Sequence, residues 1–327
     1  MKNHRHIKIY ETERKKINKI LSDALKKRKP VTLYEPGSYI LNSGGKRLRP
    51  LLVLLSAKAV GGNFNNAYNA AAAVEMLHNF TLVHDDIMDN ADKRRGRLTL
   101  HKKYDHNTAI LAGDSLLSIA YEYLLKDCNG NAKEVISSFT HGLIEVCEGQ
   151  SLDTDFESRK NVSSSEYIVM IKKKTAAMAE MCCRIGALLG GGNKTEVNAL
   201  GNFGLNLGIA FQIQDDLLDI SADEKKFGKT IGGDLVEGKK TFLFLEALEK
   251  SKGEDRQKLL KVIERRGIRR NQVLSYKQIY EKLGVLDDAQ KQIRMYTEKA
   301  LNSLKFMNEN NRKIFMWLAD SLINRTS

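Results

Sequence analysis

Proline is confined to the first fifty residues of this 327-residue chain, and the last one is Pro50. Proline breaks a helix more strongly than any other residue, because it lacks the backbone N–H and clashes with the preceding turn. The long proline-free part is rich in Leu, Ala, Lys and Glu, which favour helices. Glycine and asparagine interrupt it at 61–63, 129–131, 190–194 and 227–234. The sequence therefore predicts an all-α protein.

Apolar residues recur at helical spacing in six parts of the chain. These are residues 70–86, 109–125, 132–152, 165–189, 197–220 and 240–250. Segments 70–86 and 197–220 are apolar on most faces, so we expect them at the centre of the protein.

No linker, composition shift or repeat divides the sequence, so we expect a single domain over residues 1–327. Its expected parts are a basic N-terminal helix at 1–30, a core at about 40–245 and outer amphipathic helices at about 252–327. No apolar run approaches the roughly 20 residues that cross a bilayer, and the four cysteines show no metal-ligand spacing. These features predict a cytoplasmic protein with reduced thiols.

The formal net charge of +13 is concentrated in the first fifty residues, which hold 14 Lys and Arg against 4 Asp and Glu. A basic segment of this kind can attract nucleic acid or an anionic membrane. Aromatic residues are not interleaved with the charges, as a single-strand binding surface requires. We expect a solvated helix face, no nucleic-acid partner and at most a peripheral contact with membranes.

Two acidic motifs of identical design carry the strongest chemical signal. They are HDDIMD, with Asp85, Asp86 and Asp89, and QDDLLD, with Asp215, Asp216 and Asp219. On a helix, the first and last aspartates of each motif lie one turn apart on one face. Each motif ends an apolar segment, where the helix dipole does not stabilise negative charge, so the cluster needs cations. Carboxylate, phosphate and water oxygens suit Mg²⁺, which predicts a metal-bridged diphosphate with the two motifs facing each other across a cavity.

Basic side chains that could complete such a site also occur in short motifs. They are GGKRLRP at 44–50, RRG at 94–96, Lys174-Thr175, and Lys229 and Lys239 within FGKTIGGDLVEGKKT. Each alone is typical of a solvated surface. Together with two aspartate motifs, they indicate a site that neutralises several polyphosphate charges.

The set of motifs resembles the trans-isoprenyl diphosphate synthases, the family of farnesyl, geranylgeranyl and longer polyprenyl diphosphate synthases. The resemblance runs over about residues 40–245 and rests on GGKRLRP, HDDIMD, RRG, NTAILAGDSLLSIA, GQSLD, KKKTAAM, FQIQDDLLD and GKTIGGDLVEGKKT. It implies a bundle of about ten antiparallel helices around a deep central cavity, assembled as a homodimer.

The resemblance also implies a role for each motif residue. Asp85, Asp89 and Asp215 would hold about three Mg²⁺ ions per site, with Asp86 and Asp219 acting through water. The allylic diphosphate would be bound by Arg94, Lys174, Lys229 and Lys239, and isopentenyl diphosphate by Lys46, Arg49, His78 and Arg95. Gln150, Asp153, Thr175 and Gln212 would line the site near the reacting carbon. His78 could instead be a hydrogen-bonded histidine of the core.

The implied reaction needs no nucleophilic side chain, in agreement with the absence of a GxSxG motif. Positive charge around the diphosphate lets the allylic C–O bond ionise. The double bond of isopentenyl diphosphate attacks the carbocation, and loss of a proton leaves a chain one isoprene unit longer.

The resemblance also implies that product length depends on the helix before the first motif, because the growing chain would pass the residues about one turn before it. Phe80 and Thr81 precede Asp85 by five and four residues, which is about one helical turn. A Phe80 ring would therefore project beneath the carboxylates and block the part of the cavity that holds the growing chain. This pattern favours geranylgeranyl or farnesyl diphosphate as the product. Ordinary core packing of Phe80 and a longer-chain synthase remain alternatives.

Other classes of protein fit the sequence less well. A class I terpene cyclase normally carries Asn/Asp, Ser/Thr and Glu in its second metal motif, whereas this chain has DDLLD and a GGKRLRP motif for a second diphosphate. A regulatory subunit or nucleic-acid binder would not need both acidic motifs. A di-iron bundle needs two Glu-x-x-His pairs, and only Glu75 with His78 has that spacing.

Overall fold

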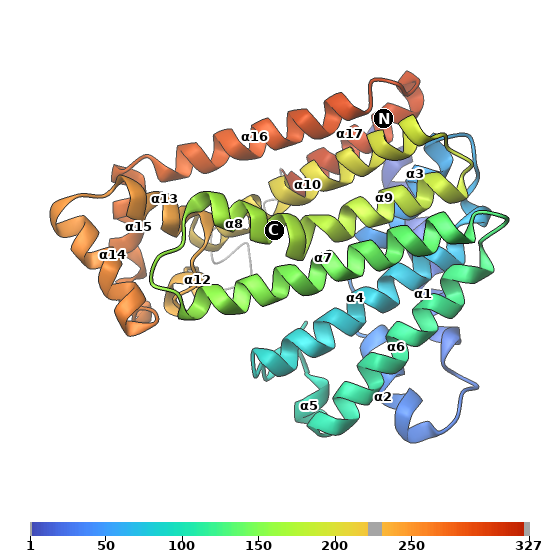
Figure 1. Ribbon diagram of the computed structural model, residues 1–327, viewed down its shortest axis with the longest axis horizontal. Helices are drawn as coiled ribbons and strands as arrows, with labels where there is room; N and C mark the ends of the chain where they lie inside the picture. The colour runs from blue at the N-terminus through green and yellow to red at the C-terminus, as the bar shows by residue number, and fades with distance from the viewer. Residues whose placement is uncertain (1, 222–230, 324–327) are drawn as a thin grey trace. The chain divides into compact units, whose positions relative to one another are not determined.

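The computed structural model describes residues 2–221 and 231–323 (Figure 1). The first helical elements are α1 (Lys2–Ala24), α2 (Val31–Leu41), α3 (Leu48–Ala59), η1 (Phe64–Asn66), α4 (Tyr68–Met88), α5 (Leu100–Lys103), α6 (His106–Lys126) and α7 (Ala132–Ser158). They are followed by α8 (Ser164–Ile171), the π-helical η2 (Lys172–Ala176), α9 (Ala177–Leu189) and α10 (Lys194–Ser221). The last are α12 (Gly233–Val236), α13 (Phe242–Lys250), α14 (Gly253–Arg265), η3 (Arg270–Gln272), α15 (Val273–Lys282), α16 (Val285–Ser303) and α17 (Glu309–Ile323). The all-α prediction is confirmed, and each of the six predicted segments is helical.

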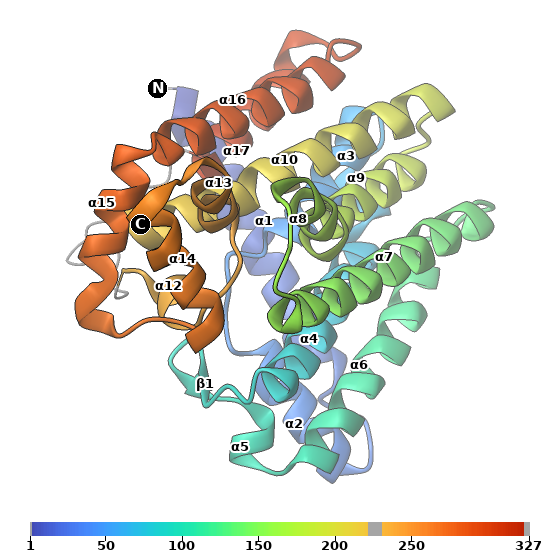
Figure 2. The same ribbon diagram turned by 60° about the vertical axis from the view of Figure 1, so that its left-hand side comes forward.

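A small hairpin is the exception to the helical pattern. Strands β1 (Lys93–Arg94) and β2 (Arg97–Leu98) pair antiparallel between α4 and α5 (Figure 2). The two turn residues, Arg95 and Gly96, have φ values of 52° and 75°, and a two-residue turn with both φ positive matches the twist of a hairpin. The sequence predicted the RRG motif as a source of positive charge but did not predict that it forms a hairpin turn.

The chain forms two compact units. Unit 1 comprises Met1–Thr140 and Met181–Leu200, and unit 2 comprises His141–Glu180 and Gly201–Ser327. Their boundaries fall inside α7, α9 and α10 rather than in linkers. The single-domain organisation therefore stays a prediction.

Unit 1 is built around α4, which lies alongside α6 (Figures 1 and 2). The alanines at 70–73 of α4 are completely buried, and their small side chains allow neighbouring helices to approach closely. One charged pair lies inside this core: Arg47 Nη1 donates to Glu75 Oε1 at 2.6 Å, with side chains only 2% and 3% exposed. The helix that carries the first aspartate motif, α4, thus also contributes Glu75 to a buried ion pair.

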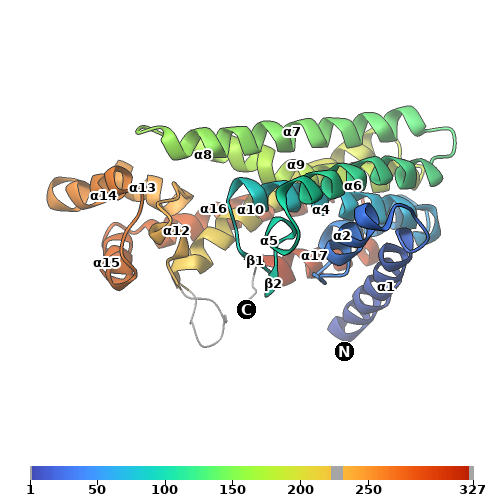
Figure 3. The same ribbon diagram turned by 90° about the horizontal axis from the view of Figure 1, so that it is seen from below.

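Unit 2 has a core of large aliphatic and aromatic side chains. They come mainly from α8, α10 and the helices after α12; examples are Tyr167, Ile213, Phe242, Phe244, Tyr280 and Ile293. Figure 3 shows α13, α14 and α15 gathered in one part of this unit. Helix α14 buries Leu259 and Val262 and exposes all its charged residues except the partly buried Asp255, as predicted for the amphipathic last third. In the part of the chain that the structure describes, no helix combines the length and hydropathy that crossing a membrane requires.

Candidate active site

The first aspartate motif lies at the C-terminal end of α4, and its central carboxylate points inward. Asp86 is 1% exposed, and Arg94 Nε donates to its Oδ1 at 2.6 Å. Its other oxygen, Oδ2, is buried and has no hydrogen-bond partner among residues 2–221 and 231–323. Burial raises the pKa of Asp86, and the charge of Arg94 opposes this shift. Asp85 is partly buried and Asp89 is exposed, so the outer carboxylates lie nearer to solvent.

The hairpin arginines connect this motif to the glycine-rich loop at 44–50. The Arg95 guanidinium donates to Ser43 Oγ at 3.2 Å and to the carbonyl oxygen of Gly44. A Cβ atom at Gly45, where φ is +133°, would lie 3.1–3.3 Å from that guanidinium. The loop therefore needs glycine at this position both for its backbone conformation and for the approach of Arg95.

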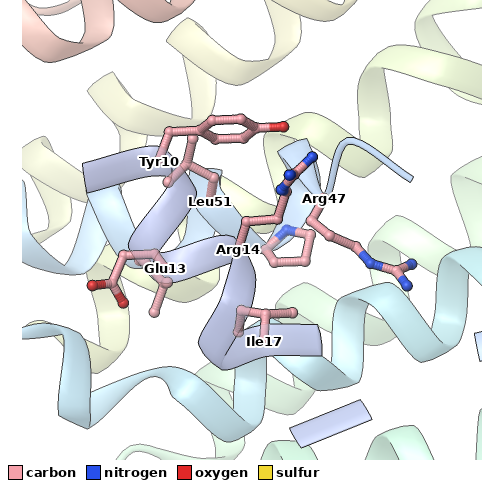
Figure 4. A pocket seen from close by; sticks show the side chains of 8 residues that line it. Tyr10, Glu13, Arg14, Ile17, Arg47 and Leu51 are labelled. Atoms are coloured by element: carbon pink, nitrogen blue, oxygen red, sulfur yellow. The ribbon is translucent and has the colours of Figure 1, made fainter. Parts of the chain in front are cut away.

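The cations of the GGKRLRP loop have different roles. Arg47 adopts a left-handed conformation (φ 51°) and pairs with buried Glu75, so it is not a charge for an external anion as the motif suggested. Lys46 is exposed, and its carbonyl oxygen accepts a hydrogen bond from Tyr10. Figure 4 shows a narrow crevice beside this loop, between α1 residues and Arg47, which none of the predicted site residues lines.

Arg49 and His78 come together in unit 1, as their shared predicted role requires. Arg49 Nη1 lies 3.2 Å from His78 Nε2. A guanidinium can only donate, so His78 Nε2 must accept and the proton of the neutral ring is on Nδ1. Burial, followed by the charge of Arg49, holds the pKa of His78 well below its usual range. This hydrogen bond is compatible with a ligand-binding histidine and with a histidine of the core.

Phe80 lies one turn before Asp85 and packs against His84, with ring centroids 4.5 Å apart. A Cβ atom at Gly113 of α6 would lie 2.7 Å from His84 Nε2, so glycine at this position leaves room for the His84 ring. The Thr81 hydroxyl donates to the carbonyl oxygen of His78 at 2.9 Å and is engaged within α4. Phe80 therefore packs against His84, and the His84 ring lies against Gly113 of α6.

The second aspartate motif lies at the C-terminal end of α10, and again the central carboxylate is buried. Asp216 is 5% exposed; its Oδ2 accepts from Tyr167 Oη at 2.5 Å and from Phe242 N at 3.2 Å, and its Oδ1 accepts from Gln212 Nε2 at 3.1 Å. Burial raises the pKa of Asp216 to about 6, while these hydrogen bonds oppose the shift. Asp215, beside it, is partly buried.

Asp219, the third member of that motif, accepts hydrogen bonds from the backbone at the beginning of α12. Its carboxylate accepts from Gly233 N at 3.2 Å and Asp234 N at 3.1 Å, at the beginning of α12 (Figure 3). Burial, followed by the charges of Asp219 and Asp216, raises the pKa of Asp234 to about 7. The sequence did not predict Asp234 as a site residue, although it is the acidic residue of the IGGD segment within FGKTIGGDLVEGKKT.

Lys174 and Thr175 lie in the π-helical segment η2, where the sequence predicted an uninterrupted helix. Such π-helical turns are frequent at functional sites. Lys174 Nζ lies 2.5 Å from Asp153 Oδ2, and the Thr175 hydroxyl donates to Gln212 Oε1 at 3.0 Å. A Cβ atom at Gly149 would lie 2.1 Å from Lys174 N, so α7 and η2 are in backbone contact.

The remaining predicted residues are less constrained. Gln150 Oε1 is buried and accepts no hydrogen bond from the part of the chain that the structure describes. Lys239 pairs with Glu237 at 2.7 Å, and both side chains are more than half exposed, so this pair contributes little stability. Lys229 lies outside the described residues. Over 2–221 and 231–323, no group of three or more His, Cys, Asp or Glu side chains is arranged to hold a metal ion.

The fold and these side chains define a class of all-α proteins with two aspartate-rich helix ends and several basic motifs. A family model described as polyprenyl synthetase matches residues 30–283. A geranylgeranyl diphosphate synthase from Sulfolobus acidocaldarius is 41% identical over 300 residues, covering 90% of this chain and 91% of the relative. A geranylfarnesyl diphosphate synthase from Natronomonas pharaonis is 42% identical over 262 residues, covering 74% and 76%.

Solved structures agree with these relatives. The crystal structure of geranylgeranyl pyrophosphate synthetase from Pyrococcus horikoshii is 35% identical, covers 99% of this chain and 100% of its own, and superimposes with a TM-score of 0.92. The chain belongs to the polyprenyl synthetase family. The resemblance read from the motifs is confirmed.

Proposed function

We propose that the protein is a prenyltransferase that condenses isopentenyl diphosphate with an allylic diphosphate to give a short-chain product, geranylgeranyl or farnesyl diphosphate. The observation that carries this proposal is the likeness to geranylgeranyl diphosphate synthases over nine-tenths of the chain, with both aspartate motifs at helix ends. The geranylfarnesyl relative, at similar identity, supports prenyl transfer but leaves product length to be measured.

Asp85, Asp89 and Asp215 are the proposed ligands of Mg²⁺, with about three ions per site. The donors fit: these are hard carboxylate oxygens, and they lie nearer to solvent than the buried central carboxylates of Asp86 and Asp216. The buried, unpartnered Oδ2 of Asp86 suits a water molecule in the outer shell of an ion. When bound, Mg²⁺ would supply positive charge to the departing diphosphate.

The basic side chains are proposed to bind the two diphosphates. Arg94, Lys174, Lys229 and Lys239 would bind the allylic diphosphate, and Lys46, Arg49, His78 and Arg95 would bind isopentenyl diphosphate. The Arg49–His78 hydrogen bond supports the second group, because a neutral His78 with its proton on Nδ1 could donate there to an oxygen. Thr175 and Gln212 would orient the allylic carbon, and the released diphosphate would accept the proton.

Phe80 is proposed to end the space for the growing chain, and its packing against the His84 ring one turn along α4 supports this role. A homodimer and a cytoplasmic location also belong to this proposal. Light scattering during gel filtration would give the oligomeric state.

Incubation of the protein with isopentenyl diphosphate, Mg²⁺ and separate dimethylallyl, geranyl and farnesyl starters tests the proposal. The expected products are linear C15 or C20 diphosphates, identified by chromatography after dephosphorylation. Cyclic hydrocarbons formed without isopentenyl diphosphate would instead identify a terpene cyclase. Unchanged substrates with all three starters would refute prenyl transfer.

A further inference from the structure

A buried tyrosine hydroxyl holds the second aspartate motif in place, and no motif in the sequence pointed to it. Tyr167 of α8 is 3% exposed and donates to Asp216 Oδ2 at 2.5 Å. Two further donors reach the same carboxylate: Gln212 Nε2 from α10 at 3.1 Å and Phe242 N from the start of α13 at 3.2 Å. Asp216 therefore joins three helices and is itself directed inward.

The direction of these hydrogen bonds is fixed by chemistry. An ionised carboxylate only accepts, so the NH₂ group of Gln212 must face Asp216. The carbonyl oxygen of Gln212 then faces Thr175, whose hydroxyl donates to it at 3.0 Å. The chain of bonds Tyr167–Asp216–Gln212–Thr175 thus sets the amide orientation of Gln212 and the rotamer of Thr175.

We infer that Tyr167 is a positioning residue for the reaction: through Asp216 it orients Gln212 and Thr175 toward the allylic carbon and fixes the helix turn that carries Asp215. This inference rests on the proposed function, which places Gln212 and Thr175 beside the reacting carbon. Tyr167 itself lies in the hydrophobic core of unit 2 and is not expected to touch substrate. Its effect should therefore appear in turnover more than in substrate binding.

The chain contains a matched control for this inference. Tyr280 of α15 belongs to the same core and is 2% exposed, but none of the described residues forms a hydrogen bond with its hydroxyl. Tyr167→Phe and Tyr280→Phe therefore remove the same atom from equally buried rings. Only the first breaks a hydrogen bond to the aspartate motif.

The test compares kcat, KM for the allylic diphosphate and the thermal midpoint of unfolding in wild type, Y167F and Y280F. We expect Y167F to lower kcat about 10- to 100-fold with KM within about threefold, because small misplacements of reacting groups have effects of this size. Y280F should retain wild-type kinetics. A kcat for Y167F within twofold of Y280F would overturn the inference.

A double-mutant cycle separates positioning from a general structural effect. Gln212→Met breaks the next bond of the chain while leaving the Tyr167–Asp216 bond intact. If Tyr167 acts through Gln212, Y167F should lower kcat less in the Q212M background than in wild type. Equal effects in both backgrounds would overturn the proposed route.

Two further outcomes are distinguishable. Should Y167F be unfolded at the assay temperature, Q212M alone must lower kcat with little change in KM, and a normal kcat there would overturn the inference. Failure of the wild type to form any prenyl product would refute the proposed function, whereas a productive wild type with a normal Y167F refutes only the role of Tyr167.

Discussion

At the scale of single residues, the three positions of each motif have different surroundings although all of them are aspartates. Asp86 and Asp216, the middle ones, are buried and bonded to Arg94 and Tyr167. Asp85, Asp89 and Asp215 are more exposed. The spacing rule predicted that the middle aspartate lies on a different helix face. It could not predict that Arg94 and Tyr167 would form hydrogen bonds with the buried aspartates, because these two residues come from other segments of the chain.

The buried pair Arg47–Glu75 gives a stability prediction. Glu75→Gln leaves the Arg47 charge buried without its counter-ion, so the free energy of unfolding should fall by about 3–5 kcal/mol. Denaturant unfolding measures the change. The control is Glu11→Gln, which removes an exposed pair with Arg14 and should cost at most about 1 kcal/mol. Equal effects of the two substitutions would contradict the structural role of Arg47.

Phe80→Ala gives a prediction on specificity. Removal of the ring should lengthen the main product by at least one isoprene unit, because Phe80 is proposed to end the space below the first motif. The product is sized by chromatography with each allylic starter. Thr81→Ala tests the second predicted chain-length residue, whose hydroxyl is hydrogen-bonded within α4. An unchanged product length would make Phe80 an ordinary core residue.

At the scale of secondary-structure elements, periodicity predicted the helices, and the exceptions have local causes. The π-helical turn at Lys172–Ala176 interrupts a stretch whose composition favours a regular helix. It is accompanied by the backbone contact between Gly149 and Lys174, which is a tertiary feature. The β1–β2 hairpin is only two residues per strand, too short for a period-2 pattern.

Helix α8 gives a prediction with a defined pH dependence. Ser163 and Glu166 form a reciprocal capping box, in which the Ser163 N–H donates to Glu166 at 2.9 Å. This bond, followed by that from Arg159, lowers the pKa of Glu166 from 4.5 to about 2. A carboxyl with a lowered pKa stabilises the fold above its unfolded pKa and loses that contribution as pH falls. Wild type should therefore be more stable than Glu166→Gln at pH 7, with the difference shrinking between about pH 4.5 and 2.

Thermal midpoints of the two proteins at pH 7, 4 and 3 measure this effect. A difference between wild type and Glu166→Gln that stays constant across this range would show that the charge of Glu166 does not contribute. Ser163→Ala removes the other half of the box and should cost about 1 kcal/mol.

Helix α1 carries the basic segment, and its exposed face tests the charge prediction. Lys15 and Lys19 lie one turn apart, both are exposed, and neither forms an ion pair with an acidic side chain of the described residues. We expect the double variant Lys15→Glu/Lys19→Glu to keep turnover within twofold and to change stability by at most about 1 kcal/mol. If anionic vesicles retained the wild type at moderate salt but did not retain the double variant, α1 would instead have a membrane partner.

At the scale of the whole molecule, the class of protein was readable from the sequence and product length was not. Class depends on motifs such as HDDIMD and QDDLLD, which occur in order along the chain. Product length is proposed to depend on Phe80, whose surroundings are formed by side chains from separate helices. Relatives with similar identity to this chain are a geranylgeranyl and a geranylfarnesyl synthase, so overall likeness does not decide it.

The central claim is that both aspartate motifs act with divalent ions to release diphosphate from the allylic substrate. The most direct measurement is kcat at saturating Mg²⁺ for Asp85→Asn and Asp215→Asn, beside Asp92→Asn, which removes a surface carboxylate paired with Lys102. The account predicts that each motif variant loses at least about 100-fold in kcat with an unchanged thermal midpoint, while Asp92→Asn retains wild-type turnover. A kcat within about tenfold of wild type for either Asp85→Asn or Asp215→Asn would contradict it.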